Sequence, residues 1–302
     1  MDKKYYKIAD ITVEVRSDLP ITENTFHPKF KQFESNGPAD EMTVIHHHFN
    51  GIPEVPVDRK NPLYLRPPWA IFEHKDQIIY EWITPQRPFK NIGKKVISDK
   101  PHSHLEIFHD DSGEKKYHGG ALESLAMFPT DQIWLAQKLS HLSGCIIHSL
   151  GVILDGNGYL FVGHSNAGKS TMAEILMKEA VILCDDRNII RKVGDKFNVY
   201  GTWSHGDVPV VSASSAPLRG IYFLKQSKHT RLLPIQENSA VIKTLLACLI
   251  RPLGSKEWWH RSMLFLNDVS KAIPCRTLEF NKSGDVLNIL QENNPQEPQQ
   301  QP

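Results

Sequence analysis

The sequence predicts a mixed α/β protein in which a β-rich first part is followed by an α/β part with a glycine-rich loop at its centre. Three observations lead to this fold class. Residues 11–15 alternate apolar and polar side chains, as a strand with one buried face does. Residues 159–162 form a continuous apolar run, which is typical of a buried strand and leads directly into the loop. Residues 171–178, after the loop, have the apolar spacing of a helix.

The first part, residues 1–125, is expected to form a β-rich N-terminal domain of unknown role. Residues 69–72 and 77–82 are rich in aromatic and β-branched side chains and flank a polar turn, which predicts a hairpin. Many prolines lie between residue 15 and this hairpin, including Pro53 and Pro56. Because proline fixes φ and removes an N–H donor, this stretch favours extended and turn conformations over helix.

The second part, residues 126–292, is expected to form a nucleotide-binding catalytic domain. Its first helix is predicted near 130–142, with Thr130 or Asp131 as the N-cap. Residues 151–162 and 188–200 predict hairpins, because their turns hold residues that tolerate positive φ. The remaining pattern predicts, in order, strands at 181–184 and 218–224, helices at 239–250 and 256–272, a strand at 275–280 and a helix at 284–291. The polar tail, residues 293–302, is expected to be disordered.

Composition excludes several classes of partner. The 302-residue chain has 35 Lys and Arg against 34 Asp and Glu, and no block of like charge, so it lacks the footprint of a nucleic-acid or membrane-surface protein. No apolar run approaches the ~20 residues that span a bilayer, and the first residues lack the apolar core of a signal peptide. We therefore expect a cytoplasmic protein. Its four widely spaced cysteines are expected to be buried free thiols.

Residues 163–171, GHSNAGKST, satisfy the phosphate-binding pattern G-x-x-x-x-G-K-[S/T]. The two glycines permit backbone conformations that turn several N–H groups toward a phosphate. The lysine supplies a positive charge for the outer phosphates, the serine hydroxyl is placed to ligate Mg²⁺, and the following helix directs its positive end to the same point. The pattern predicts an ATP and Mg²⁺ site whose nucleotide-binding residues are Gly163, Ser165, Asn166, Ala167, Gly168, Lys169, Ser170 and Thr171.

Asp185 and Asp186 follow the loop by about one helix and one strand. We expect them at the carboxyl end of a strand that neighbours the strand of the loop, where ligands bind in α/β folds. A carboxylate there can hold Mg²⁺ or accept the proton of an attacking hydroxyl. His148, upstream of the loop, and His205, in a glycine-flanked loop beside Asp207, are candidates for contacting a phosphate oxygen or tuning these carboxylates.

Two further groups of histidines invite a metal-site interpretation. His46, His47 and His48 are adjacent, and neighbouring residues on a strand point to opposite faces, so we do not expect three in a row to converge on one ion. His102 and His104 are expected to share a strand face, but no third ligand follows at a suitable spacing. We therefore expect both groups to be structural.

These residues, in this order, resemble the catalytic domain of HPr kinase/phosphorylase and its relatives, which share a phosphate-loop core with phosphoenolpyruvate carboxykinases. The resemblance covers residues 145–290 and rests on HSLGV around His148, the loop GHSNAGKST, and CDD at 184–186. The segment YGTWSHGD, residues 200–207, resembles a loop of the broader HPr-kinase-like group, some members of which phosphorylate serine in modified peptides. The resemblance implies a PEP carboxykinase-like P-loop core, with Asp185 as base, Asp186 and Ser170 on Mg²⁺, His148 at the phosphate, and a possible homo-oligomer.

The function expected from this site is transfer of the γ-phosphoryl group of ATP to a hydroxyl, most simply that of serine, in a protein, peptide or small molecule. One alternative is a nucleotide-binding regulator or assembly protein without phosphotransfer, which contacts a partner through the first domain. Another is a carboxykinase-like enzyme that acts on a carboxylic acid. These alternatives differ in the fate of the γ-phosphate, which the sequence does not reveal.

Overall fold

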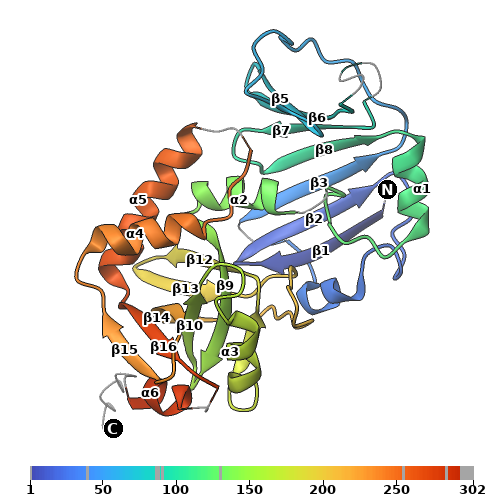
Figure 1. The fold of residues 1–302 in the computed structure, drawn as a ribbon. Helices are drawn as coiled ribbons and strands as arrows, with labels where there is room; N and C mark the ends of the chain where they lie inside the picture. Colours follow the sequence, from blue (N-terminus) through green and yellow to red (C-terminus); the bar gives the residue numbers. More distant parts are fainter. Residues whose placement is uncertain are drawn as a thin grey trace. The chain divides into compact units, whose positions relative to one another are not determined.

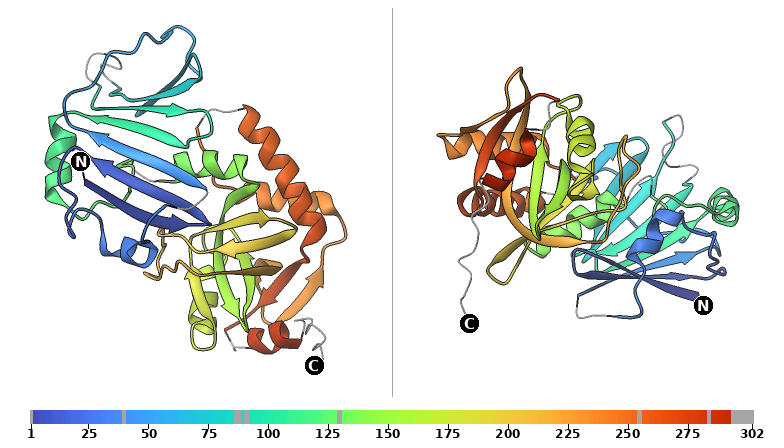
Figure 2. Two further views of the ribbon diagram at one scale, coloured as in Figure 1. Left: turned by 180° about the vertical axis from the view of Figure 1, so that it is seen from behind. Right: turned by 90° about the horizontal axis from the view of Figure 1, so that it is seen from below.

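The computed structural model describes residues 2–38, 41–85, 89, 92–128, 131–253, 256–282 and 285–292. Two compact units account for the chain: unit 1 comprises Met1–Leu142 and Arg251–Arg261, and unit 2 comprises Ser143–Ile250 and Ser262–Pro302. Each contains a large β-sheet together with helices (Figures 1 and 2). The fold class is therefore mixed α/β, as the sequence predicts. The tail at 293–302 lies outside the described residues.

Unit 1 is built on an eight-stranded sheet. Strands β2, β3 and β8 are parallel to one another, and the other pairs are antiparallel, including the predicted hairpin of β5 and β6. The strand order across the sheet is β1 (Asp2–Ile8), β2 (Ile11–Ser17), β3 (Met42–His48), β8 (His104–His109), β7 (Lys94–Asp99), β6 (Gln77–Trp82), β5 (Trp69–His74) and β4 (Tyr64–Arg66).

The two faces of this sheet differ in chemistry. Val15, Ile45 and Leu105 are register neighbours on β2, β3 and β8, and all are fully buried on the core face. The next register position holds Arg16, His46 and Glu106, which lie on the opposite face because successive side chains alternate. We call this second side, which carries Arg16, His46 and Glu106, the polar face of unit 1.

Unit 1 contains the 3₁₀-helix η1 (Pro28–Phe33), α1 (Asp111–Gly119), α2 (Gln132–His141) and residues 256–261 of helix α5 (Lys256–Ala272), the rest of which belongs to unit 2. Helix α1 was not expected from the sequence pattern. Its N-terminus is capped by Asp110, whose carboxylate accepts a hydrogen bond of 2.9 Å from the Gly113 N–H. His102 has φ of 55° in a turn before β8, and so it does not share a strand face with His104 as expected.

The division between units falls after residue 142 rather than near 125. The segment from Ser124 to α2 is held together by the buried carboxylate of Asp131, which accepts hydrogen bonds from the N–H groups of Leu125 and Ala126 and from Trp134 Nε1. Lys138 of the same helix donates to Ser103 Oγ at 2.8 Å. These bonds tie α2 to unit 1. Thr130, which with Asp131 was an expected N-cap of this helix, lies outside the described residues.

Unit 2 contains a second eight-stranded sheet, in which β14 pairs with both β13 and β10. Its hairpins, its strand at 181–184 and its helices after residue 238 correspond to the predicted elements. The strands are β9 (Gly144–Leu154), β10 (Asn157–Val162), β11 (Val181–Cys184), β12 (Arg187–Val193), β13 (Lys196–Tyr200), β14 (Ser215–Gln226), β15 (Arg231–Pro234) and β16 (Cys275–Phe280); the helices are α3 (Lys169–Leu176), α4 (Asn238–Ala247), α5 (Lys256–Ala272) and α6 (Val286–Glu292).

Strand β11, which ends at Cys184 just before Asp185, does not lie beside the strand of the loop as expected. It pairs with β9, and β9 pairs in turn with β10. Because both β10 and β11 are antiparallel to β9, they run in the same direction, and their carboxyl ends meet at one edge of the sheet. The loop after β10 and the two aspartates after β11 therefore still come together.

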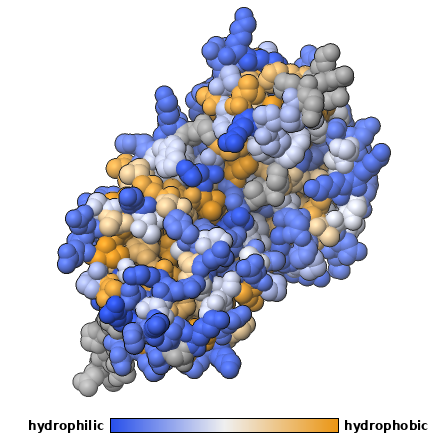
Figure 3. Space-filling view, viewed as in Figure 1, coloured by the Kyte–Doolittle hydropathy of each residue, from blue (hydrophilic) through white to orange (hydrophobic). Residues whose placement is uncertain are grey.

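The face shown in Figure 3 is covered largely by hydrophilic residues with hydrophobic ones between them. Among the described residues, no helix is both long and apolar enough to cross a membrane. All four cysteines are free, and Cys145, Cys184 and Cys248 are buried, as the sequence predicts, whereas Cys275 is only partly buried.

Candidate functional site

The loop between β10 and α3 takes a conformation that its residue types explain. Gly168 has φ of 101°, and a Cβ there would lie 2.6 Å from a ring carbon of Phe280. A Cβ at Gly163 would lie 2.5 Å from the Cβ of Ala167. Asn166 has φ of 66°, which asparagine tolerates better than most residues. The glycines at both ends of the loop are thus required by close packing and by backbone conformation.

Lys169 and Ser170 begin α3 and face the loop. The Nζ of Lys169, which is 8% exposed, donates to the carbonyl oxygens of Gly163 at 2.9 Å and His164 at 3.1 Å. Burial lowers the pKa of Lys169, and nearby negative charges, including that of Asp207, oppose this shift. Ser170 Oγ donates to Asp207 Oδ2 over a long 3.4 Å. The arrangement places one cation and one hydroxyl at the start of a helix, where the dipole is positive.

Asp185 is 3% exposed, and backbone donors fix its carboxylate. Oδ1 accepts from the Gly206 N–H at 2.7 Å, and Oδ2 accepts from the Val208 N–H at 2.8 Å. A Cβ at Gly206 would lie 3.1 Å from Asp185 Oδ2, so the close approach of this loop depends on glycine. Asp185 therefore anchors the segment that carries Asp207 beside Ser170.

Asp186 is paired with His148. His148 Nδ1 lies 2.8 Å from Asp186 Oδ1 and 3.0 Å from the Asp186 carbonyl oxygen, and Arg187 lies 3.2 Å from Asp186 Oδ2. Burial would raise the pKa of Asp186, but the hydrogen bond from His148 and the charge of Arg187 outweigh it and lower the pKa. Because Nδ1–H faces these acceptors, the Nε2 lone pair of His148 is left without a protein donor among the described residues.

These side chains line one cavity of about 460 Å³ in unit 2. His205 does not line it: this histidine is exposed, and its Nδ1 contacts the Gly206 carbonyl oxygen. Gly163 and Ala167 shape the loop without lining the cavity. Three lining residues were not among the expected site residues: Gly206, Asp207 and Gln226. The cavity is lined by His148, Ser165, Asn166, Gly168, Lys169, Ser170, Thr171, Asp185, Asp186, Gly206, Asp207 and Gln226.

Local sequence patterns point only weakly to these three residues. Asp207 stands in a glycine-flanked polar loop beside His205 and belongs to no phosphate-binding pattern. Gln226 ends β14, far along the chain from the loop, and its Nε2 donates to the Asn166 carbonyl oxygen at 2.9 Å. Its position depends on the pairing of β10 with β14, which no local pattern encodes.

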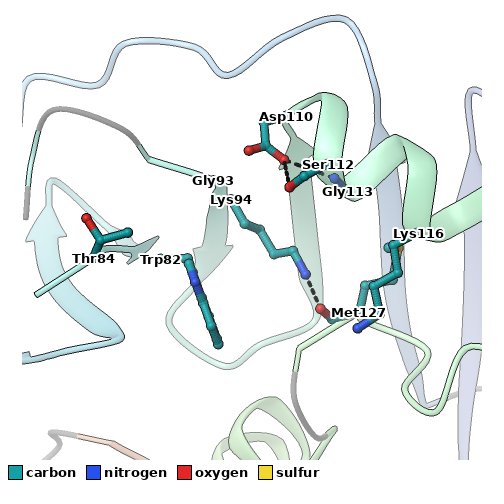
Figure 4. Close-up of a pocket in the computed structure, with 9 residues that line it drawn as sticks. All are labelled: Trp82, Thr84, Gly93, Lys94, Asp110, Ser112, Gly113, Lys116 and Met127. Carbon is teal, nitrogen blue, oxygen red and sulfur yellow. Dashed lines mark hydrogen bonds between the residues drawn. The ribbon is translucent and has the colours of Figure 1, made fainter.

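A second cavity, of about 520 Å³, lies within unit 1 (Figure 4). Its lining includes Trp82, Lys94 and the exposed Lys116. The Lys94 ammonium donates to the Met127 carbonyl oxygen, and burial, aided by the charge of Lys116, lowers the pKa of Lys94 to about 7. Since Lys94 is held by a backbone carbonyl and is only weakly basic, this cavity is a less suitable site for a highly charged phosphate chain.

Fold and site together define a two-unit α/β protein with a glycine-rich loop of the phosphate-binding pattern. A family model described as "SynChlorMet cassette protein ScmC" matches residues 123–290, more than half of the chain. The chain therefore belongs to the ScmC family. A search of curated proteins finds no match.

Among solved structures, the chain is similar to one described as the Hpr(Ser) kinase/phosphatase from Coxiella burnetii. The two are 10% identical with a TM-score of 0.27, over 49% of this chain and 88% of that chain. A likeness this weak says nothing of what the present chain binds or does.

Proposed function

We propose that unit 2 binds ATP with Mg²⁺ at the loop of residues 163–170 and transfers the γ-phosphoryl group to a hydroxyl, such as that of serine, in a protein, peptide or small molecule. The observation that carries this proposal is the convergence of Lys169, Ser170 and the Asp185–Asp186 pair on one cavity. In the reaction, a bond forms between the acceptor oxygen and the γ-phosphorus, the bond from that phosphorus to ADP breaks, and the acceptor proton passes to a base.

The residues of this cavity fit a nucleoside triphosphate. The close packing at Gly163 and Gly168 holds the loop at the start of α3, whose first residues, 169–171, line the cavity. A helix N-terminus favours bound phosphate. In the bound state Lys169 would exchange its two carbonyl contacts for phosphate oxygens, a stronger charge-assisted interaction. Gln226 supports the loop from β14 through Asn166.

Mg²⁺ neutralises phosphate charge in reactions of this class. The residues that would hold it are Ser170, through its hydroxyl, and an acidic partner. Asp186 is the partner implied by the family resemblance. The structure adds Asp207, because Ser170 Oγ already contacts its carboxylate, whereas both oxygens of Asp186 face His148 and Arg187. We therefore propose Asp207 beside Ser170 as a metal ligand, with Asp186 nearby.

Two groups could take the acceptor proton. Asp185 is the base by resemblance, and its carboxylate lines the cavity. Its two backbone donors orient the carboxylate. The second group is His148, whose Nε2 is free while Asp186 holds Nδ1. We retain Asp185 as the base and assign His148, oriented by Asp186, to the phosphate or the acceptor hydroxyl.

We also propose that unit 2 has the PEP carboxykinase-like P-loop core that the motif resemblance implies. The sequential arrangement of β10, the loop, α3 and β11 supports this assignment. Here β11 and β10 are separated by β9.

The test follows the γ-phosphate. Full-length protein with Mg²⁺ and γ-labelled ATP is incubated with cell extract separated into protein, peptide and metabolite fractions. The proposal predicts label in one fraction, lost in Lys169→Met and retained in Lys116→Met, a charge change at the other cavity. Asp185→Asn is a less clean control, since its amide would face a backbone N–H and disturb the 206–208 segment.

Other outcomes of this experiment select the alternatives. ATP binding without label in any fraction, and unchanged by His148→Ala, would overturn the kinase proposal in favour of a nucleotide-dependent regulator. ATP-dependent decarboxylation of oxaloacetate would instead indicate a carboxykinase-like enzyme.

A further inference from the structure

A cluster of two histidines and two carboxylates lies on the polar face of unit 1. His46 and His48 are two positions apart on β3 and therefore share this face, while His47 points to the core and is fully buried. Asp18 directly follows β2, and Glu106 lies on β8. Because β2, β3 and β8 are neighbouring parallel strands (Figure 1), these four side chains meet although they are far apart in sequence.

Each imidazole lies between the two carboxylates. On one side, Asp18 Oδ1 lies 3.1 Å from His46 Nε2 and Asp18 Oδ2 lies 3.1 Å from His48 Nδ1. On the other side, Glu106 Oε2 lies 3.5 Å from His46 Nδ1 and 2.5 Å from His48 Nε2. All four ring nitrogens thus face carboxylate oxygen, and the ring centroids are only 3.9 Å apart.

Three of these contacts, at 2.5–3.1 Å, are hydrogen bonds, whereas the contact of His46 Nδ1 with Glu106 is a longer 3.5 Å. Two neutral imidazoles carry only two N–H groups, so one of the three short contacts would set a nitrogen lone pair against a carboxylate. A third proton would make one ring a cation, although the side chains of His46 and His48 are only 11% and 20% exposed.

A metal ion on the Asp18 side removes this conflict. We propose that Asp18, His46 and His48 bind a divalent first-row transition-metal ion such as Zn²⁺ or Co²⁺. One ligand atom from each of these residues lies within 4.8 Å of the others. Donors about 2.1 Å from a tetrahedral ion are roughly 3.4 Å apart, so small side-chain movements close the site.

Glu106 has a different role, that of orienting the ligands. With the ion on the Asp18 side, the remaining N–H of each ring points to Glu106, which is the carboxylate–histidine–metal arrangement that fixes the tautomer of a ligating histidine. His104 lies 3.5 Å from the other oxygen of Glu106. The Asp18 side chain is 26% exposed, which leaves access for the ion and for a water ligand. The ion would join strands β2 and β3, with β8 as the outer support.

The experiment is a Co²⁺ titration of tag-free, metal-depleted full-length protein in excess Mg²⁺, which occupies oxygen sites but not imidazole sites. The proposal predicts visible Co²⁺ absorption that saturates with a single ion per chain and disappears when Zn²⁺ is added. His46→Ala and His48→Ala should abolish it, and the isosteric Asp18→Asn should weaken binding strongly. Glu106→Gln should weaken binding by about 10–100-fold.

The matched control is His118→Ala, which removes an exposed histidine of α1 and should leave the titration unchanged. Circular dichroism of each variant separates loss of ligands from loss of fold. Two results would overturn the proposal: no Co²⁺ signal from the wild-type protein, or an equal signal in folded His46→Ala and His48→Ala variants. The cluster would then be a hydrogen-bonded imidazolium–carboxylate network.

Discussion

In unit 1 the polar side chains lie across the face of a sheet, whereas in unit 2 they lie beyond the ends of β10 and β11. The polar face of unit 1 brings together residues from three strands that are separated by up to about ninety positions in the chain. The cavity of unit 2 is formed mainly by two short segments, the loop and the Asp185–Asp186 pair, joined by one helix and one strand. A site at strand ends can be recognised from a local sequence motif. The residues of a site on a sheet face come together only through the register of neighbouring strands, which a local motif does not reveal.

The two units also differ in the contacts of their buried charged groups: Glu81 in unit 1 is paired with cations, and Lys169 in unit 2 is not paired with a carboxylate of the described residues but faces the proposed phosphate site. In unit 1, Glu81 is fully buried and contacts Arg59 at 2.7 Å and the buried Lys95 at 3.4 Å. In unit 2, the Lys169 ammonium donates to the carbonyl oxygens of Gly163 and His164 and lines a cavity. Replacing the first kind of group should reduce stability, and replacing the second kind should reduce function.

The largest effect is expected for Glu81→Ala. This change leaves the Lys95 ammonium buried, with the Pro53 carbonyl at 2.6 Å as its remaining contact. Loss of one partner of a buried ion pair typically lowers the free energy of unfolding by about 3–5 kcal/mol. Urea denaturation of the full-length protein measures this change in the free energy of unfolding. The matched control, Glu73→Ala, breaks an exposed 2.7 Å pair with Lys100 and should cost less than about 1 kcal/mol. Similar losses of unfolding free energy in Glu81→Ala and Glu73→Ala would show that the buried ion pair contributes no more to stability than the exposed one.

Lys169→Met, unlike Glu81→Ala, should reduce phosphoryl transfer and leave stability almost unchanged. Loss of one preorganised electrostatic contact lowers the rate of transfer by about 10²–10³-fold. The free energy of unfolding should hardly change, because burial already disfavours the charged amine. Initial rates of label transfer and urea denaturation of the same sample test both halves of the prediction. A variant that unfolds more easily and keeps its transfer rate would reverse our assignment of Lys169.

A smaller effect is expected for Gly206→Ala. The added Cβ would lie 3.1 Å from Asp185 Oδ2 and 3.2 Å from Asp186 Cβ, so the carboxylates or the 206–208 segment must give by a few tenths of an ångström. A misplacement of about 1 Å can lower the rate about 10²-fold, so we expect a loss of transfer rate below about 10²-fold. Steady-state transfer measures the change, and Gly119→Ala, where the added Cβ meets nothing within 4 Å, is the control. Full activity in Gly206→Ala would show that the 206–208 segment does not position the carboxylates.

The smallest effect is a pH dependence in unit 1. His102 is buried and its Nε2 lies 2.7 Å from Tyr80 Oη; burial lowers its pKa from 6.5 to about 4. Below pH 6.5 the unfolded chain takes up a proton that the folded chain does not, so stability falls as the pH falls toward 4. The loss at pH 5 is about 2 kcal/mol relative to pH 7.5. Urea denaturation at pH 5 and at pH 7.5 should show a smaller loss of unfolding free energy in His102→Gln than in the wild type, because glutamine does not titrate. An equal loss in the two proteins would mean that His102 is not kept neutral by the fold.

Local patterns in the sequence predict much of unit 2. The loop, the helix after it, the hairpins and the aspartate pair all rest on contacts within a few tens of residues. The neighbour of β11 was predicted wrongly, because pairing with β9 rather than β10 is a choice among distant strands. The contact of Asp207 with Ser170 depends on backbone donors to Asp185, which no spacing reveals.

The polar face of unit 1 was harder to predict for the same reason. His47 points away from His46 and His48, as strand alternation predicts, and contacts His109 on the core side. His46 and His48 are two positions apart on one face and meet Asp18 and Glu106, whose positions depend on strand register and cannot be read from the three adjacent histidines. Helix α1 was not predicted because its mostly polar sequence has little apolar periodicity, and its start depends on the Asp110 cap.

The most direct test of the central claim, that the loop of unit 2 is a nucleotide site, is a calorimetric titration of the full-length protein with ATP and Mg²⁺. We expect saturable binding at a single site, lost in Lys169→Met and in Gly163→Val, whose side chain would collide with Ala167. Lys116→Met, at the cavity of unit 1, should bind as the wild type does. Binding that survives both changes in the loop and is lost in Lys116→Met would place the nucleotide in unit 1 and contradict the account.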